Sequence, residues 1–247
     1  MKLNLINPNT TLSMTRLIAS AATQVAAENT FLRAVSPAAG APSIEGHLDE
    51  AIAAVGVIEQ VLAGEAEGCD AHIIACFGDP GLDAAREVAR GPVLGIAEAA
   101  MRAATFLTSR FSVITTLQRT VVIAEHLALK YGVAQQCQRV RAVEIAVLAL
   151  EDPESDAYQR ILAECRLALV EDRAEALVLG CAGMADLAQR LSAELGVPVI
   201  DGVGVAVGMA ETLVRNGLNT SKRGDFAAPI GKTYSGWAQP FSPEPQA

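Results

Sequence analysis

The chain has 247 residues, of which 51% are hydrophobic, and a formal net charge of -9. This length can hold one large domain or two lobes of about 100–150 residues around a substantial core, so the composition predicts a globular protein. The 19 Lys and Arg residues form no long run, and the acidic excess argues against nucleic acid as a partner.

The N-terminus and the cysteines indicate where the protein works. The first residues, M-K-L-N-L-I-N-P-N-T, have neither the blocks of a signal peptide nor the length of a membrane span. Five cysteines, an odd number without a C-x-x-C pair, favour reduced thiols over disulfide bonds. We therefore predict a cytoplasmic protein that does not bind membranes. The three scattered histidines predict no metal site.

Short apolar runs alternate with longer Ala-rich segments of helical periodicity, a pattern typical of parallel strands joined by helices. Strands are predicted near 2–6, 31–36, 71–75, 92–95, 111–115, 141–147, 176–180 and 198–200. The predicted helices include 10–27, 46–63, 118–131, 154–172 and 203–216. The stretch from Ser221 to Ala247 is rich in Pro, Gly and polar residues, which predicts an irregular arm on the surface or against a neighbouring subunit.

The two halves of the chain resemble each other. An apolar strand that ends in Cys-x-Gly occurs at Cys76 and again at Cys181, 105 positions later. The same offset aligns Thr10 with Thr115, and P-V-L-G at 92–95 matches P-V-I-D at 198–201. Three matches predict a duplicated α/β fold with parallel sheets. The active site is expected in the cleft between the halves, where strands present their carboxyl ends.

The two repeated cysteines are the candidate catalytic groups. Cys76 and Cys181 each follow a predicted strand ahead of a helix, where free N–H groups and the helix dipole favour a thiolate. Pseudo-symmetric halves present these thiols to a substrate from opposite sides. Racemisation needs a base on one face of a carbon and an acid on the other, with roles that swap in the reverse direction. Thiols with a pKa near neutral suit both roles.

A structural interpretation competes with the catalytic one. A free cysteine after an apolar strand is more often a small buried core residue than a functional group. Cys165 fits that interpretation because it falls on an apolar helical stripe, and Cys69 and Cys137 lack counterparts in the other half. The repeated Cys-x-Gly setting favours the catalytic interpretation for Cys76 and Cys181.

At these residues the sequence resembles the aspartate/glutamate racemase superfamily and, within it, the hydantoin and allantoin racemases. The matching segments are I-N-P-N-T at 6–10, P-S-I-E-G at 42–46, A-C-F-G-D-P-G-L at 75–82, L-G-C-A-G-M at 179–184, V-P-V-I-D-G-V at 197–203 and T-S-K at 220–222. The resemblance implies a two-base racemase of a small molecule that needs no cofactor, with Cys76 and Cys181 as the bases. It also implies homo-oligomers and two Rossmann-like lobes, 1–96 plus 204–247 with Cys76, and 97–203 with Cys181.

One departure from the wider superfamily indicates the substrate. Racemases of free amino acids usually carry Cys-Asn-Thr after the first thiol and Cys-Thr after the second. Here Cys76 is followed by Phe77 and Gly78, and the second thiol by Ala182 and Gly183, so side chains that hold a zwitterion are missing. Free backbone N–H groups and an aromatic cover suit a neutral cyclic ureide. The resemblance slightly favours allantoin over other 5-substituted hydantoins.

The remaining substrate-binding candidates lie in loops beside the predicted cleft. They are Asn7, Asn9, Thr10, Ser43, Ile44, Asp79, Thr115, Thr116 and Asp201. Most also fit a role as helix caps, and capping is the stronger interpretation for Asp79, which precedes Pro80, and for Asp201. The resemblance suggests that Ser43 and Ile44 contact the exocyclic part of the substrate.

Four other functions stay open. The chain could be an amino-acid racemase or a maleate isomerase of the same superfamily, although Cys-Phe-Gly speaks against the former. A non-catalytic sensor or binding protein would use the thiols for a redox response. A thiol hydrolase would need a histidine near one thiol, and none of the three lies in a recognisable site motif.

Overall fold

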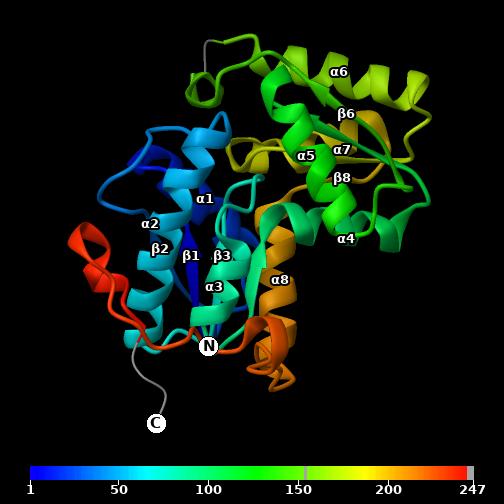
Figure 1. The fold of residues 1–247 in the computed structure, drawn as a ribbon. Coiled ribbons are helices and arrows are strands. Elements are labelled where there is room, and N and C mark those ends of the chain that lie inside the picture. Colours follow the sequence, from blue (N-terminus) through cyan, green and yellow to red (C-terminus); the bar gives the residue numbers. More distant parts are fainter. Residues whose placement is uncertain (153–154, 244–247) are drawn as a thin grey trace.

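The chain forms two lobes, each built on a four-stranded parallel sheet (Figure 1). The computed structural model describes residues 1–152 and 155–243. The first sheet has the order β2-β1-β3-β4, with β1 (Lys2–Ile6), β2 (Phe31–Val35), β3 (Ala71–Ile74) and β4 (Val93–Gly95). The second has the order β6-β5-β7-β8, with β5 (Phe111–Thr115), β6 (Cys137–Ala142), β7 (Ala176–Leu179) and β8 (Val199–Ile200). The equal strand order confirms the predicted fold of two similar α/β lobes.

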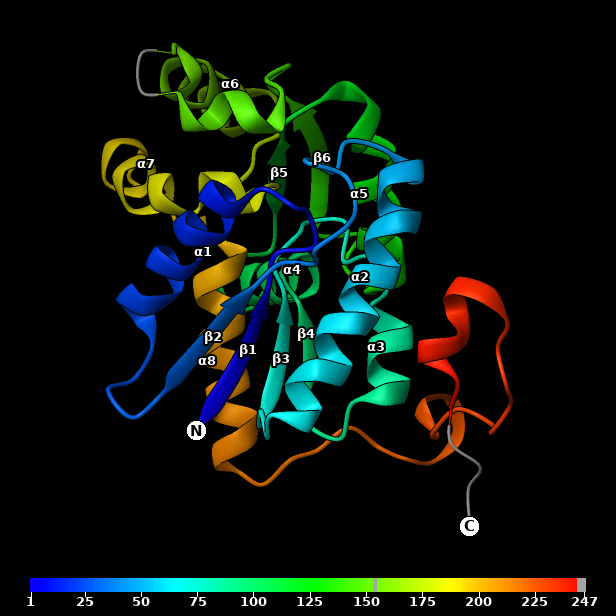
Figure 2. The same ribbon diagram turned by 90° about the vertical axis from the view of Figure 1, so that its left-hand side faces the viewer.

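Helices cover both faces of the sheets, which explains why the central strands are apolar on both sides. The α-helices are α1 (Leu12–Val25), α2 (His47–Ala66), α3 (Leu82–Val88), α4 (Ile96–Leu107), α5 (Gln118–Lys130), α6 (Ala157–Glu171), α7 (Ala188–Leu195) and α8 (Gly202–Arg215). Short 3-10 helices are η1 (Val147–Glu151), η2 (Ala182–Leu187), η3 (Gly224–Phe226) and η4 (Gly236–Phe241). Figure 2 shows α1 and α8 on one side of the first sheet and α2 and α3 on the other. Of the helices in the described residues, none is both long and apolar enough to cross a membrane.

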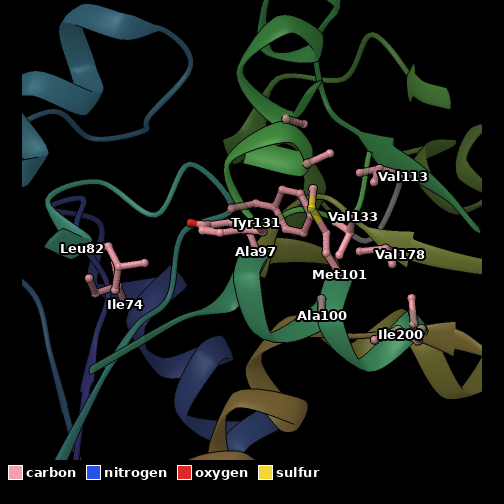
Figure 3. Packing of buried hydrophobic residues seen from close by; sticks show 14 of the residues in the cluster. Ile74, Leu82, Ala97, Ala100, Met101, Val113, Tyr131, Val133, Val178 and Ile200 are labelled. Atoms are coloured by element: carbon pink, nitrogen blue, oxygen red, sulfur yellow. The ribbon is translucent and has the colours of Figure 1, made fainter. Parts of the chain in front are cut away.

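One apolar cluster extends through both lobes (Figure 3). It contains Ile74 of the first sheet and Val113 and Val178 of the second, and α4 contributes Met101 between them. Most of the buried side of α4 is Ala, which lets the helix lie close to α8 and to β7. The lobes therefore share a packed core next to the place where their strands end.

The predicted strand at 141–147 is wrong, because β6 occupies Cys137–Ala142. Val143 and Ile145 still donate backbone hydrogen bonds to the end of β5, and they alternate with exposed residues as a strand would. Glu144, however, has a left-handed φ of 54°, which interrupts the ladder. Strand β6 begins before the apolar residues from which a strand was predicted. Its first residues are polar because β6 lies at the edge of the sheet, where one side meets solvent.

The alignment of Thr10 with Thr115 is also wrong. Strand register pairs Ile6 with Ile74 in the first sheet and Ile114 with Leu179 in the second. Ile6 and Ile114 are therefore equivalent, and the residue after them is Asn7 in the first lobe and Thr115, the last residue of β5, in the second. The first lobe has extra residues in its Asn-Pro-Asn loop, and these displace Thr10 from the equivalent position.

The segment after α8 is irregular, as predicted, and its first part is fixed to the first lobe (Figure 2). Thr220 donates a hydrogen bond to the carbonyl of Gly91 at 2.6 Å, and Lys222 Nζ bonds to the carbonyl of Arg86 at 2.6 Å. Beyond this anchor Trp237 is 75% exposed. Helix α8 packs on α1 and β3 of the first lobe and also on α4. The division into 1–96 with 204–247 and 97–203 stays a prediction.

A buried carboxylate connects the two lobes. Asp79 Oδ1 accepts a hydrogen bond from the backbone N–H of Ala97 at 3.1 Å, and Oδ2 accepts one from Glu98 at 2.9 Å. The hydroxyl of Tyr131, at the end of α5, donates to Asp79 Oδ2 at 2.6 Å, and Figure 3 shows the Tyr131 oxygen directed towards the first lobe. Asp79 therefore caps a helix, as the sequence suggested, but that helix is α4 rather than α3.

Replacing Tyr131 by Phe should destabilise the fold in a pH-dependent way. Burial raises the pKa of Asp79 to about 6, and the Tyr131 hydrogen bond acts against this rise. Stability contributed by the protonated carboxyl is therefore lost as the pH rises through about 6. Removing the donor enlarges that loss, so we expect a cost of about 2 kcal/mol at pH 8 and about 1 kcal/mol at pH 5. Urea unfolding at both pH values measures it.

The matched control is Tyr158→Phe. Tyr158 also donates to a carboxylate, that of Glu194 at 2.9 Å, but this pair is exposed. We expect a cost below about 0.5 kcal/mol that does not change with pH. Equal losses in the two variants, or a Tyr131→Phe cost independent of pH, would contradict the role assigned to Asp79.

Candidate active site

Cys76 and Cys181 line one small cavity of about 60 Å³. Each lies two residues beyond a strand, Cys76 after β3 and Cys181 after β7, and these strands hold equivalent positions in the two sheets. Both cysteines are partly buried. The fold therefore brings the two repeated cysteines to the same enclosed space, each from its own lobe, whereas Cys165 is buried in the core on the inner face of α6.

Burial governs the protonation of both thiols. It raises the pKa of the Cys76 thiol far above its ordinary range, and the N–H of Gly78 offsets this only in part. Burial also raises the pKa of the Cys181 thiol to about 11, although the N–H of Gly183 acts to lower it. The expectation of values near neutral is wrong because loss of solvation outweighs a few N–H groups. Cys76 also does not lie directly at the start of a helix, since α3 begins only at Leu82.

The two thiols also influence each other. Burial is the largest cause of the raised pKa of Cys76, and the N–H of Gly78 lowers that pKa. The negative charge of Cys181 is the next cause that raises it, followed by the charges of Glu50 and Asp79. Like charges in one site do not ionise together, so the first proton lost makes the second harder to remove. Because the pKa of both thiols is raised, the cavity favours two neutral thiols near neutral pH and disfavours the state with two thiolates.

Nine of the predicted substrate-binding residues line the cavity with the cysteines. They are Asn7, Asn9, Ile44, Phe77, Gly78, Thr115, Thr116, Ala182 and Gly183. Asn7 and Asn9 also serve the backbone of their own loop. Asn7 Nδ2 donates to Asn9 Oδ1 at 2.9 Å, and the same oxygen accepts from the N–H of Thr11 at 2.9 Å. Both interpretations of these asparagines, ligand contact and local capping, are therefore compatible with their positions.

Four predicted binding residues are not among those that line the cavity: Thr10, Ser43, Asp79 and Asp201. Thr10 bonds to the carbonyl of Ala41, and Asp79 holds α4 and Tyr131. Asp201 is the N-cap of α8, where its carboxylate accepts from the N–H groups of residues 203 and 204. The carboxylates of Asp79 and Asp201 are thus used to start helices, which leaves the capping interpretation for both.

Several residues of the cavity were not predicted from sequence. They are Met14, Gly46, Glu50, Ala75, Thr120, Ile123, Ala124, Val147 and Gly180. Glu50 is the one with a formal charge. In sequence it is an ordinary acidic residue of a first helical turn, where it favours the helix dipole, so its local pattern gives no sign that it faces a site.

Comparison with known proteins agrees with this geometry. Two lobes of equal strand order around a shared cavity define the class of racemase-fold proteins. The Asp/Glu/hydantoin racemase family model matches residues 3–210. The chain belongs to this family of isomerases.

Relatives match over nearly their whole length. A hydantoin racemase from Rhizobium meliloti is 49% identical over 96% of this chain and 98% of that protein. The structure of an allantoin racemase from Klebsiella pneumoniae is 56% identical with a TM-score of 0.96, and covers 98% of this chain and 99% of that one. An allantoin racemase from Pseudomonas fluorescens is 42% identical with a TM-score of 0.92, over 96% of this chain and 100% of that one.

The order of the thiol pKa values predicts an order of reactivity. Because burial raises the pKa of Cys76 above that of Cys181, iodoacetamide should modify Cys181 first. Between pH 7 and pH 9 both rates should rise roughly tenfold per pH unit, since the thiolate fraction does so well below the pKa. Peptide mass spectrometry after timed quenching measures each site. Faster modification of Cys76, or rates that do not depend on pH, would contradict the assignment.

Proposed function

We propose that this protein is a racemase of 5-substituted hydantoins that needs no cofactor, with allantoin as the favoured substrate. The observation that carries the proposal is the shared cavity, which Cys76 and Cys181 enter from equivalent strand ends of the two lobes. The names of the relatives support hydantoin-type substrates, and two of those relatives are allantoin racemases.

The proposed reaction moves one proton at each face of the C5 carbon. One thiolate removes the C5 proton, and the electron pair passes into the neighbouring ring carbonyl as an enolate. The opposite thiol gives its proton to the other face of C5 and becomes the thiolate. The thiolate and the thiol have then exchanged places, which is the starting state of the reverse reaction. Two identical groups therefore serve both directions.

The electrostatics of the site suit this reaction. The charge of one thiolate opposes ionisation of the other group, so once one cysteine has lost its proton the opposite cysteine stays the thiol that the reaction requires. A buried thiolate with a raised pKa is a stronger base than an exposed one, at the cost of a small thiolate fraction. The C5 proton lies beside a carbonyl and is acidic enough for such a base. Homo-oligomers and a cytoplasmic location remain predictions, and exposed apolar residues such as Trp237 provide surface for assembly.

Optical rotation of single enantiomers tests the reaction. (R)-Allantoin and (S)-allantoin should each lose rotation, and 5-benzylhydantoin should do so with a lower kcat/KM. The activity should survive dialysis against EDTA without added metal, pyridoxal phosphate or nicotinamide. Turnover of free aspartate or glutamate in place of the hydantoins, or loss on dialysis that metal restores, would overturn the proposal.

Exchange of the C5 proton in deuterated water tests the two-base mechanism. Cys76→Ser and Cys181→Ser should each abolish racemisation, because an alkoxide base is not available near neutral pH and every turnover uses both groups. Each variant should still exchange the proton of one enantiomer with retention, and the two variants should act on opposite enantiomers. NMR measures the exchange. The mechanism fails if both variants exchange the same enantiomer, or if either racemises at the wild-type rate.

Cys165→Ser is the matched control, because Cys165 lies in the core and away from the cavity. It should lower stability through the buried hydroxyl and leave the kcat of the folded enzyme within about twofold of the wild type.

A further inference from the structure

The cavity has one side chain with a formal charge. Among the described residues that line it, this is Glu50, in the first turn of α2. Its side chain is only 19% exposed, and burial raises the pKa of its carboxyl despite the opposing effect of His47. A carboxylate in such a place is costly unless hydrogen-bond donors reach it.

The Glu50 carboxylate lies between solvent and the loop that carries Cys76 and Gly78. On one side it rests against Gly78, where a Cβ atom would overlap Glu50 Oε1, so glycine at that position leaves the space that the carboxylate fills. On the other side Glu50 Oε2 is 3.5 Å from Nδ1 of His47, whose side chain is 74% exposed. Glu50 therefore lies at the outer end of the cavity, on the side of Cys76.

Two neighbouring acidic residues accept hydrogen bonds from backbone N–H groups of the described residues, and Glu50 does not. Glu45 Oε1 accepts from the N–H of Val147 at 2.8 Å, and Asp49 Oδ2 accepts from the N–H of Glu45 at 2.9 Å. Within the described residues the one polar partner of the Glu50 carboxylate is His47. Its remaining acceptor sites are available to a ligand in the cavity.

The proposed reaction fixes which part of a ligand comes near this wall. The two thiols approach C5 from opposite faces, so the substituent on C5 lies in the plane between them, directed at neither thiol. Ile44 and Gly46, which precede α2, and Glu50, in its first turn, line the cavity together and form a wall that carries neither thiol. A substituent that extends outward along this wall reaches the Glu50 carboxylate.

We propose that Glu50 is a specificity-determining residue that accepts hydrogen bonds from N–H groups on the C5 substituent. The ureido group of allantoin carries such N–H groups, whereas the side chains of apolar hydantoins do not. The inference rests on the proposed function and extends it, because it assigns the choice among hydantoins to one residue. An apolar substituent would leave the cavity side of the carboxylate without a donor, and a site that leaves such a polar group unpaired rejects the wrong substrate strongly.

A pair of substrates with the same shape tests this inference. 5-Isobutylhydantoin replaces the ureido group of allantoin with a branched apolar group of similar size and no donors. The ratio of kcat/KM for allantoin to that for 5-isobutylhydantoin is measured in the wild type, Glu50→Gln and Glu50→Leu. The control is Glu59→Leu, because Glu59 is exposed on the same helix and lies outside the cavity.

We expect Glu50→Leu to lower kcat/KM for allantoin by 10- to 100-fold and to leave that for 5-isobutylhydantoin unchanged or higher, since a charge-assisted hydrogen bond is lost for one substrate alone. Glu50→Gln keeps an acceptor without the charge, so its loss should be smaller. It also tests the inference if the leucine variant does not fold. Glu59→Leu should keep the wild-type ratio.

A second measurement needs no substrate. The negative charge of Glu50 contributes to the raised pKa of Cys76, so Glu50→Gln should speed the iodoacetamide reaction of Cys76 at pH 8 and leave that of Cys181 unchanged. Unchanged reactivity of Cys76 would contradict the position assigned to the carboxylate.

The results separate failure of the inference from failure of the proposed function. A wild type that racemises both hydantoins, with an equal loss for both in Glu50→Leu, overturns the specificity role alone. A wild type that prefers 5-isobutylhydantoin does the same. A wild type that racemises neither compound overturns the proposed function and, with it, the basis of this inference.

Discussion

The buried carboxylate of Asp79 is the constraint on which the geometry of the site depends. It lies three residues after Cys76, holds the first N–H groups of α4 and accepts the hydroxyl of Tyr131 from the second lobe. Gly95 has no Cβ, and one there would overlap this carboxylate. The loop that carries one thiol is thereby fixed to the lobe that carries the other. A movement of the lobes that separates the thiols must break a hydrogen bond to a buried charge, which is among the more costly hydrogen bonds to lose.

The enclosure that results has two chemical consequences. Loss of solvation raises the pKa of both thiols, and the charge of a Cys181 thiolate opposes ionisation of Cys76. The same enclosure makes each buried polar group selective, because a group without a partner is destabilising. Most of the lining is apolar or hydroxyl-bearing, and the carboxylate of Glu50 stands out at its outer end. Reactivity and substrate choice in the proposed enzyme thus have one physical origin, which is the removal of water.

Local sequence patterns predicted the central strands well, because those strands are apolar on both sides. They failed at the edge strand, where one side is buried and the other meets solvent. The strands 2–6 and 111–115 agree with β1 and β5, because both are central strands with continuous apolar residues. The edge strand β6 was misplaced, since a polar edge resembles a loop and the apolar residues after it resemble a strand. The repeat identified the cysteine pair, but its fixed offset misaligned Thr10 with Thr115, because the loop after β1 is longer than its counterpart.

The sequence by itself determined the alternation of strands and helices, the duplication, and the two cysteines at equivalent strand ends, because these are written in local periodicity and in matching segments. Tertiary structure alone decided that Asp79 caps α4 and bonds to Tyr131, that burial raises the pKa of both thiols, and that Glu50 faces the cavity. The physical reason is that solvation and hydrogen-bond partners depend on groups far apart in the chain. A pattern of neighbouring residues specifies which faces are apolar, but it does not specify which distant donor or charge those faces meet.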